Sequence, residues 1–256
     1  MASATWPVRA SLFVTCIIDQ IYPEVGDSTV RLLRRLGVEL DFPAAQTCCG
    51  QPAFNSGFWS DAKPLARRTI ELLQHDRYVV VPSGSCASMM RVFYAELFHD
   101  EPAMQQRIAS LASRTYELTE FIVDVLGIDD LSAYVEAEPS QYKRKITYHE
   151  GCHLRRELHA QTQPRTLLDS LPDVELVEME QSEVCCGFGG TFSVKFPEIS
   201  GAMLNDKLKY AGKTGADSIT ACDSSCLMHI GGGIAKRRMD IQPQHIAQVL
   251  DDALTG

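Results

Sequence analysis

Residues 185–195 read CCGFGGTFSVK and residues 47–57 read TCCGQPAFNSG, so a Cys-Cys-Gly triplet occurs twice in the chain. A lone cysteine precedes each triplet, and a Ser-Cys pair follows it. Matched cysteines are separated by 136, 137 and 140 residues, counted from 16 to 152, from 49 to 186 and from 86 to 226. Near-constant offsets at three landmarks indicate a tandem duplication. The matched sets are Cys16, Cys48, Cys49 and Cys86, and Cys152, Cys185, Cys186 and Cys226.

The boundary between the two repeats is predicted from residues that interrupt the periodic segments. Gly127 and Pro139 stand between the two sets of cysteines, where the apolar pattern stops. Glycine and proline both break regular secondary structure. We therefore expect a first repeat over residues 1–135 and a second repeat over residues 136–256.

The spacing of apolar residues predicts the same elements in each half. Short apolar runs at 11–15 and 146–148 are typical of buried strands, and each precedes a lone cysteine. Segments with helical spacing separate these runs from the later ones. The later strand candidates are 38–42 and 78–81 in the first half, and 174–177 and 216–221 in the second.

Strands that alternate with helices predict parallel sheets with right-handed crossovers. We expect an α/β fold of two tandem pseudo-repeats, each a small three-layer unit with a parallel sheet. Every cysteine group follows the carboxyl end of a predicted strand, where the loops of open α/β sheets converge. The sequence thus predicts three thiol-bearing loops at one edge of each unit.

The overall composition limits the classes of function. The 256 residues include 24 Lys+Arg and 33 Asp+Glu, which gives a formal net charge of −9. An acidic chain without a long basic stripe argues against nucleic acid as a partner. Apolar runs fall short of the roughly 18 residues that a membrane span needs, and no convincing secretory signal is present. A cytoplasmic protein is the resulting expectation.

Nine cysteines in a reducing compartment are more typical of metal or redox chemistry than of disulfides. The adjacent thiols of each triplet diverge, which suits two irons of one cluster better than one tetrahedral ion. Gly50 and Gly187 would let the backbone approach a cluster and donate N–H bonds to its sulfurs. Gly189 and Gly190 extend the second loop into a nest of backbone N–H groups. The triplets favour an iron–sulfur cluster; zinc, and catalytic or buried thiols, remain alternatives.

Three further side chains are candidates for chemistry in the second half. His149 and His153 lie close to Cys152 in the sequence and could transfer a proton or bind a substrate carboxylate. Alternatively, His153 caps the helix that follows or donates a hydrogen bond to a thiolate. Lys195 could pair with an anionic substrate or with the negative charge of a cluster, or could lie in solvent.

The quoted motifs resemble those of a known family. Twin Cys-Cys-Gly triplets with a lone cysteine before and Ser-Cys after resemble the cysteine-rich CCG-domain proteins. These include the B subunit of heterodisulfide reductase and the iron–sulfur subunit of glycolate oxidase. Within that group, residues 13–16 (FVTC), 47–57 and 185–195 are similar to the lactate utilization protein A family, and the resemblance covers essentially the whole chain.

This resemblance implies an oxidoreductase subunit that is not active alone. It would belong to a cytoplasmic iron–sulfur system that oxidises L-lactate to pyruvate, with electron transfer through one or two 4Fe–4S clusters per chain. The implied partners are companion lactate-utilization subunits, including a ferredoxin-like iron–sulfur protein. L-Lactate would be the small-molecule substrate of the complex.

The chain departs from the family pattern at one position of each repeat. In the wider family five cysteines ending in Cys-x-x-Cys hold a non-cubane cluster, but here Ser83 and Asp223 stand first in that pair. The four remaining thiols suffice for a cubane cluster, so both cluster forms stay open. In the second repeat Cys222 or Asp223 is a candidate fifth ligand. The alternatives in function are a thiol–disulfide reductase subunit of the heterodisulfide type and a zinc-stabilised assembly scaffold.

Overall fold

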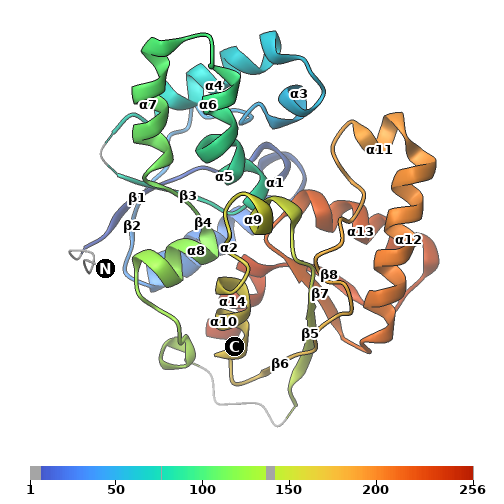
Figure 1. Ribbon diagram of the computed structural model, residues 1–256. Helices are drawn as coiled ribbons and strands as arrows, with labels where there is room; N and C mark the ends of the chain where they lie inside the picture. Colours follow the sequence, from blue (N-terminus) through green and yellow to red (C-terminus); the bar gives the residue numbers. More distant parts are fainter. Residues whose placement is uncertain (1–6, 76, 137–141, 256) are drawn as a thin grey trace. The chain divides into compact units, whose positions relative to one another are not determined.

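The computed structural model describes residues 7–75, 77–136 and 142–255. Its internal contacts divide the chain into two compact units, residues 1–127 and 128–256. Each unit contains a four-stranded parallel sheet with helices packed against it, which confirms the expected α/β fold of two tandem repeats (Figure 1). The predicted division between residues 135 and 136 stays a prediction, and Pro139 lies outside the described residues.

The first unit is built on strands β1 (Arg9–Leu12), β2 (Glu39–Asp41), β3 (Tyr78–Val81) and β4 (Thr115–Glu117). Its helices are α1 (Cys16–Ile21), α2 (Pro23–Arg35), α3 (Gln51–Asn55), α4 (Trp59–Leu72), α5 (Gly84–Ser88), α6 (Tyr94–Leu97), α7 (Pro102–Ala112) and α8 (Leu118–Glu120), with π-helical turns η1 (Met89–Phe93) and η2 (Phe121–Val125). The strand order is β2-β1-β3-β4, and all neighbours are parallel. In Figure 1, α4, α6 and α7 cover one face of this sheet, and α2 and α8 cover the other.

The second unit repeats this plan with strands β5 (Arg144–Tyr148), β6 (Val174–Leu176), β7 (Ser218–Ala221) and β8 (Gln242–His245). Its helices are α9 (Cys152–Arg156), α10 (Gln163–Asp169), α11 (Phe192–Lys195), α12 (Pro197–Lys213), α13 (Ser224–Arg237) and α14 (Ile246–Thr255), with the 3-10 turn η3 (Ser132–Tyr134). The order is β6-β5-β7-β8, again all parallel. In Figure 1, α12 and α13 lie on one face and α10 and α14 on the other. Within the described ranges, none of the helices is long and apolar enough to span a membrane.

The central strands of each sheet are buried on both faces. Val79, Val80 and Val81 of β3 are fully buried, and all four residues of β7 are buried. Such strands, covered by helices on both sides, are typical of parallel sheets. The outer strands β4 and β8 were not predicted from the sequence. β4 has only three residues. β8 reads Gln-Pro-Gln-His and contains a proline, which is tolerated because β8 is an edge strand.

The first strand is shifted from its predicted position. β1 ends at Leu12 instead of Thr15, although the Phe13 N–H still donates to the Val80 carbonyl over 2.9 Å. Thr15 then precedes α1, which begins at Cys16. The first lone cysteine therefore lies in the first turn of a helix directly beyond the sheet.

The strand order gives each sheet a topological switch point. In the first unit the chain passes from β1 to β2 on one side and then crosses to β3 on the other side of β1. In the second unit β5, β6 and β7 follow the same path. Ligands of open α/β sheets bind outside the carboxyl ends of the strands at such a point. Each set of cysteines lies in the loops and helix starts that follow these strands.

The last residue of β4 carries a buried carboxyl group. Glu117 is fully buried, and its carboxylate accepts hydrogen bonds from the N–H (2.7 Å) and hydroxyl (2.5 Å) of Thr119. The Glu120 carboxylate accepts a hydrogen bond from the Glu117 N–H, which completes the capping box of α8. Burial outweighs these bonds and raises the pKa of Glu117 to about 8.

We predict that Glu117→Gln flattens the pH dependence of stability. A carboxyl group with a raised pKa favours the folded chain fully below its ordinary pKa near 4.5, and this contribution is lost as the pH rises toward 8. The wild-type unfolding free energy should fall across this window by on the order of a few kcal/mol. Urea unfolding at a series of pH values measures it. The exposed control Glu96→Gln should keep the wild-type slope, and an equal slope in Glu117→Gln would contradict the prediction.

Candidate metal centre

Four thiols of the first unit gather at the carboxyl edge of its sheet. Cys16 begins α1 after β1, Cys48 and Cys49 lie in the loop after β2, and Cys86 lies in α5 after β3. The sulfurs of Cys16 and Cys48 are 3.6 Å apart, and those of Cys49 and Cys86 are 3.2 Å apart. The structure therefore brings together the four thiols that the sequence spacing singled out in this half.

The second unit repeats the arrangement. Cys152 begins α9 after β5, Cys185 and Cys186 lie in the loop after β6, and Cys226 lies near the start of α13 after β7. Hydrogen bonds connect Cys152 to Cys185, Cys185 to Cys186, and Cys186 to Cys226. The four thiols thus follow one another in space in the same order as in the first unit.

The thiols of each set control one another's ionisation. Hydrogen bonds from Cys16 and Cys49 lower the pKa of Cys48 to about 3. The bond to Cys48, together with burial, raises the pKa of Cys16 far above its ordinary value. In the second unit the pKa of Cys185 is lowered to about 2 and that of Cys152 is raised, for the same reasons. The four thiols of one set can therefore ionise together only beside a cation.

The glycine of each triplet has a defined structural role. Gly50 and Gly187 both have a φ of +89°, and each N–H donates to the sulfur of the first cysteine of its pair over 3.4 Å. A Cβ atom at Gly187 would lie 2.7 Å from the Ser200 carbonyl oxygen, and one at Gly50 would lie 3.2 Å from that of Ala62. The triplet needs glycine for its turn and for its packing on the next helix. The following glycines, Gly189 and Gly190, also have positive φ, +51° and +60°.

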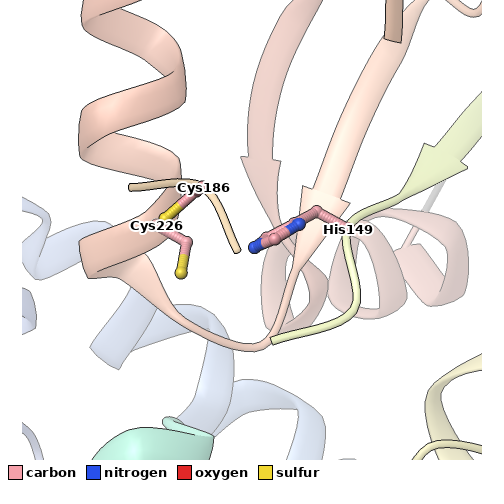
Figure 2. A group of neighbouring side chains, drawn as sticks. All are labelled: His149, Cys186 and Cys226. Carbon is pink, nitrogen blue, oxygen red and sulfur yellow. The ribbon is translucent and has the colours of Figure 1, made fainter. Parts of the chain in front are cut away.

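His149 adds a nitrogen donor to the thiols of the second unit. It follows β5 directly, is fully buried, and donates its backbone N–H to the Thr220 carbonyl over 2.8 Å. Potential ligand atoms of His149, Cys186 and Cys226 all lie within 4.8 Å of one another, and the imidazole points toward the two sulfurs (Figure 2). A hydrogen bond with Cys186 and the neighbouring imidazole lower the pKa of Cys226 to about 6.

The other two candidates for catalysis lie nearer the surface. His153 pairs through Nδ1 with the carboxylate of Glu157, the residue directly after α9, over 3.0 Å. Lys195 is the last residue of α11 and is exposed. An i,i+4 pair of this kind stabilises its own helix, which agrees with the structural interpretation of His153. A role in proton transfer or anion binding stays a prediction for both residues.

Cys222 and Asp223, the candidate fifth ligands, have different surroundings. Cys222 is buried, and its sulfur lies 3.6 Å from the Tyr148 hydroxyl. Asp223 is also buried, directly before α13, and a Cβ atom at Gly151 would lie 2.8 Å from its carboxylate. Gly151 therefore allows this carboxylate to lie against the backbone next to Cys152. In the first unit Ser83 has this place, and its hydroxyl accepts the Cys86 N–H over 3.3 Å.

Comparison with known proteins agrees with the duplication of the sequence. The family model of the cysteine-rich CCG domain matches residues 10–91 and again residues 146–231. Lactate utilization protein A of Shouchella clausii is 47% identical over 95% of this chain and 99% of its own length. The chain belongs to the lactate utilization protein A family. Members from Oceanobacillus iheyensis (lactate utilization protein A) and Bacillus cereus (lactate utilization protein A 2) are 43% and 42% identical, over 97% and 96% of this chain and 99% of their own lengths.

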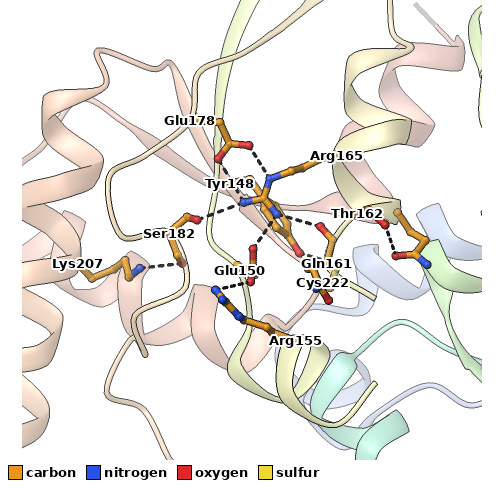
Figure 3. Close-up of polar contacts among 11 residues, drawn as sticks. Tyr148, Glu150, Arg155, Gln161, Thr162, Arg165, Glu178, Ser182, Lys207 and Cys222 are labelled. Atoms are coloured by element: carbon orange, nitrogen blue, oxygen red, sulfur yellow. Dashed lines mark hydrogen bonds and ion pairs between the residues drawn. The ribbon is translucent and has the colours of Figure 1, made fainter. Parts of the chain in front are cut away.

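This member of the lactate utilization protein A family carries an ion-pair network around Glu150 in its second unit (Figure 3). Glu150 is buried and accepts a hydrogen bond from Arg165 over 2.8 Å. Arg165 also donates to the Glu178 carboxylate and to the Ser182 hydroxyl. Because the Glu150 N–H donates to the Ser182 carbonyl as well, over 3.1 Å, the network fixes the loop that leads into the second triplet.

A buried lysine of α12 also binds the loop that leads into the second triplet. Lys207 of α12 is fully buried, and its ammonium group donates to the carbonyl oxygens of Gln181 (2.9 Å) and Ser182 (3.0 Å). Burial lowers its pKa to about 8. The sequence analysis missed Arg165 and Lys207. The position of Lys207 directly before Leu208, on the apolar side of its helix, was the available signal.

We predict that Gly187→Ala destabilises the second unit more than Gly215→Ala does. Both glycines have positive φ, but a Cβ atom at Gly215 meets no other atom within 4 Å, whereas one at Gly187 meets backbone at 2.7 Å. The conformational strain alone costs about 1–2 kcal/mol, and the backbone clash should bring the cost at Gly187 to roughly 3 kcal/mol or more. Urea unfolding of the metal-free protein measures both. Equal losses of stability would show that the close approach is unimportant.

Proposed function

We propose that the chain is the iron–sulfur subunit of a cytoplasmic system that oxidises L-lactate to pyruvate. In this proposal each unit holds one 4Fe–4S cluster through its four matched thiols and transfers electrons. The names of the relatives support the lactate system. The observation that carries the proposal is that four thiols converge in the same spatial order at the switch point of each sheet.

The donor set suits such a cluster. Four thiolates are the usual protein ligands of a 4Fe–4S cluster, which supplies one-electron transfer when bound. The proposed ligands are Cys16, Cys48, Cys49 and Cys86 in the first unit, and Cys152, Cys185, Cys186 and Cys226 in the second. Two thiols on adjacent residues, with an N–H donated to one sulfur by the next glycine, favour a multi-iron group over a single tetrahedral ion.

The surrounding residues orient the thiols and exclude water from part of each set. Cys49 is 1% exposed and Cys186 is 2% exposed, whereas the first cysteine of each pair is only partly buried. The Tyr94 hydroxyl donates to the Cys49 carbonyl over 2.9 Å, and Lys207 and Arg165 fix the loop before the second triplet. One side of each set thus lies in the core, and the other faces solvent, where a redox partner can approach.

Electron counting supports a multi-subunit system. Oxidation of lactate to pyruvate releases two electrons, whereas a 4Fe–4S cluster passes them one at a time. We therefore include companion lactate-utilization subunits in the proposal, among them a ferredoxin-like iron–sulfur protein. L-Lactate is the substrate of the complex, and the isolated chain is expected to be inactive on it.

Metal analysis of the anaerobically purified chain tests the proposal. We predict about eight iron atoms and about eight acid-labile sulfides per chain, because two four-iron clusters need four of each. Electron paramagnetic resonance of the reduced sample should show a cluster signal. Stoichiometric zinc without sulfide, even after anaerobic iron–sulfur reconstitution, would instead establish the zinc scaffold. Turnover of a disulfide substrate by the purified complex, without lactate oxidation, would establish the reductase alternative.

Serine variants test the two sets separately. Cys49→Ser with Cys86→Ser should remove about half of the iron, and Cys186→Ser with Cys226→Ser should remove the other half. Cys222→Ser is the matched control: it replaces a buried thiol of the second unit that lies against the Tyr148 hydroxyl, so the iron content should stay at the wild-type level. A loss of iron in Cys222→Ser would add this thiol to the ligands.

A further inference from the structure

The imidazole of His149 is buried, and its polar neighbours are thiols. The residue is fully buried, and within the described part of the chain neither Nδ1 nor Nε2 makes a well-formed hydrogen bond; the ring interacts only with the Cys226 thiol, whose pKa it lowers. Buried polar groups in native proteins are nearly always satisfied, and an unpaired one costs about 1–3 kcal/mol. Two unpaired nitrogens on one ring therefore call for a bound partner.

The surroundings of the ring identify the chemistry of that partner. A potential ligand nitrogen of His149 lies within 4.8 Å of the sulfurs of Cys186 and Cys226 and points toward them (Figure 2). Imidazole nitrogen and thiolate sulfur together are the donors that proteins use for zinc and for iron. The backbone of the residue is held in place, because its N–H donates to the Thr220 carbonyl of the neighbouring strand, and the side chain is fully buried.

The first unit shows that the fold does not require a histidine here. Phe13 stands three residues before Cys16, as His149 stands three residues before Cys152. The Phe13 N–H donates to Val80 over 2.9 Å, as the His149 N–H donates to Thr220 over 2.8 Å, and both side chains are fully buried. The two rings thus occupy equivalent places. A hydrocarbon ring meets the packing requirement, so the nitrogens of His149 serve another purpose.

We infer that His149 is a ligand of the metal centre in the second unit. The inference rests on the proposed function and makes the two centres chemically different: the first has thiolate ligands, and the second has thiolates and one neutral imidazole. Replacement of thiolate by histidine raises the reduction potential of an iron–sulfur centre. The second centre should therefore accept an electron more readily than the same centre with only thiolate ligands.

Pulsed electron paramagnetic resonance tests the ligand directly. The full chain is labelled with ¹⁵N-histidine, carries Cys49→Ser and Cys86→Ser to remove the first centre, and is purified without oxygen and reduced. We expect the strong nitrogen coupling of a directly bound imidazole. His149→Phe, which introduces the residue type of the first unit, should abolish this coupling. His153→Gln, at the other histidine beside Cys152, should leave it unchanged.

His149→Cys provides a second readout that does not require the second unit to fold with phenylalanine at this position. It should retain iron, lose the nitrogen coupling and shift the reduction potential of the second centre to a lower value, because a charged thiolate replaces a neutral ligand. A cluster signal with only weak or absent nitrogen coupling, or an unchanged potential in His149→Cys, would overturn the inference and leave the proposed function intact. Failure of the second unit to take up iron and sulfide after reconstitution would overturn both.

Discussion

The parallel pairing of one central strand with two neighbours is the constraint on which both units depend. β1 pairs with β2 on one side and β3 on the other, and β5 pairs in the same way with β6 and β7. All strands of a parallel sheet end at the same edge, so the segments after these three strands meet there. Cysteines more than thirty residues apart in the sequence become neighbours for this reason alone.

The sites are continuous with the hydrophobic cores. Cys186 packs in one cluster with Leu204, Leu208 and Ile219, and Cys49 and Cys86 are equally part of the buried interior of their unit. Neutral thiols pack there as small apolar groups, but thiolates at the same positions repel one another and lose hydration. Formation of a charged site therefore opposes folding of the same residues until a cation is bound, so cluster binding and stability are linked.

The sequence predicted what local patterns encode and missed what long-range contacts decide. The apolar runs predicted the central strands, because that signal lies within short windows, and the repeated spacing of the cysteines predicted the eight matched thiols, because the two halves of the sequence can be compared with each other. β8 escaped prediction because Gln-Pro-Gln-His has no strand-like pattern and becomes a strand only by pairing with β7. Lys207 and Arg165 escaped for a similar reason. Their shared partner Ser182 lies 25 and 17 residues away in the sequence, and only the fold brings it to them.

The two units differ where geometry leaves them free to differ. The left-handed glycine, its N–H bond to a cysteine sulfur and the order of the thiols are shared, because the backbone path demands them. Around the thiols the side chains diverge: Ser83 caps its helix where Asp223 brings a carboxylate, and Phe13 packs where His149 brings two nitrogens. Each exchange preserves the packing and changes the charge or donor next to the sulfurs. A duplicated scaffold can in this way hold two centres of the same architecture and unequal affinity for electrons.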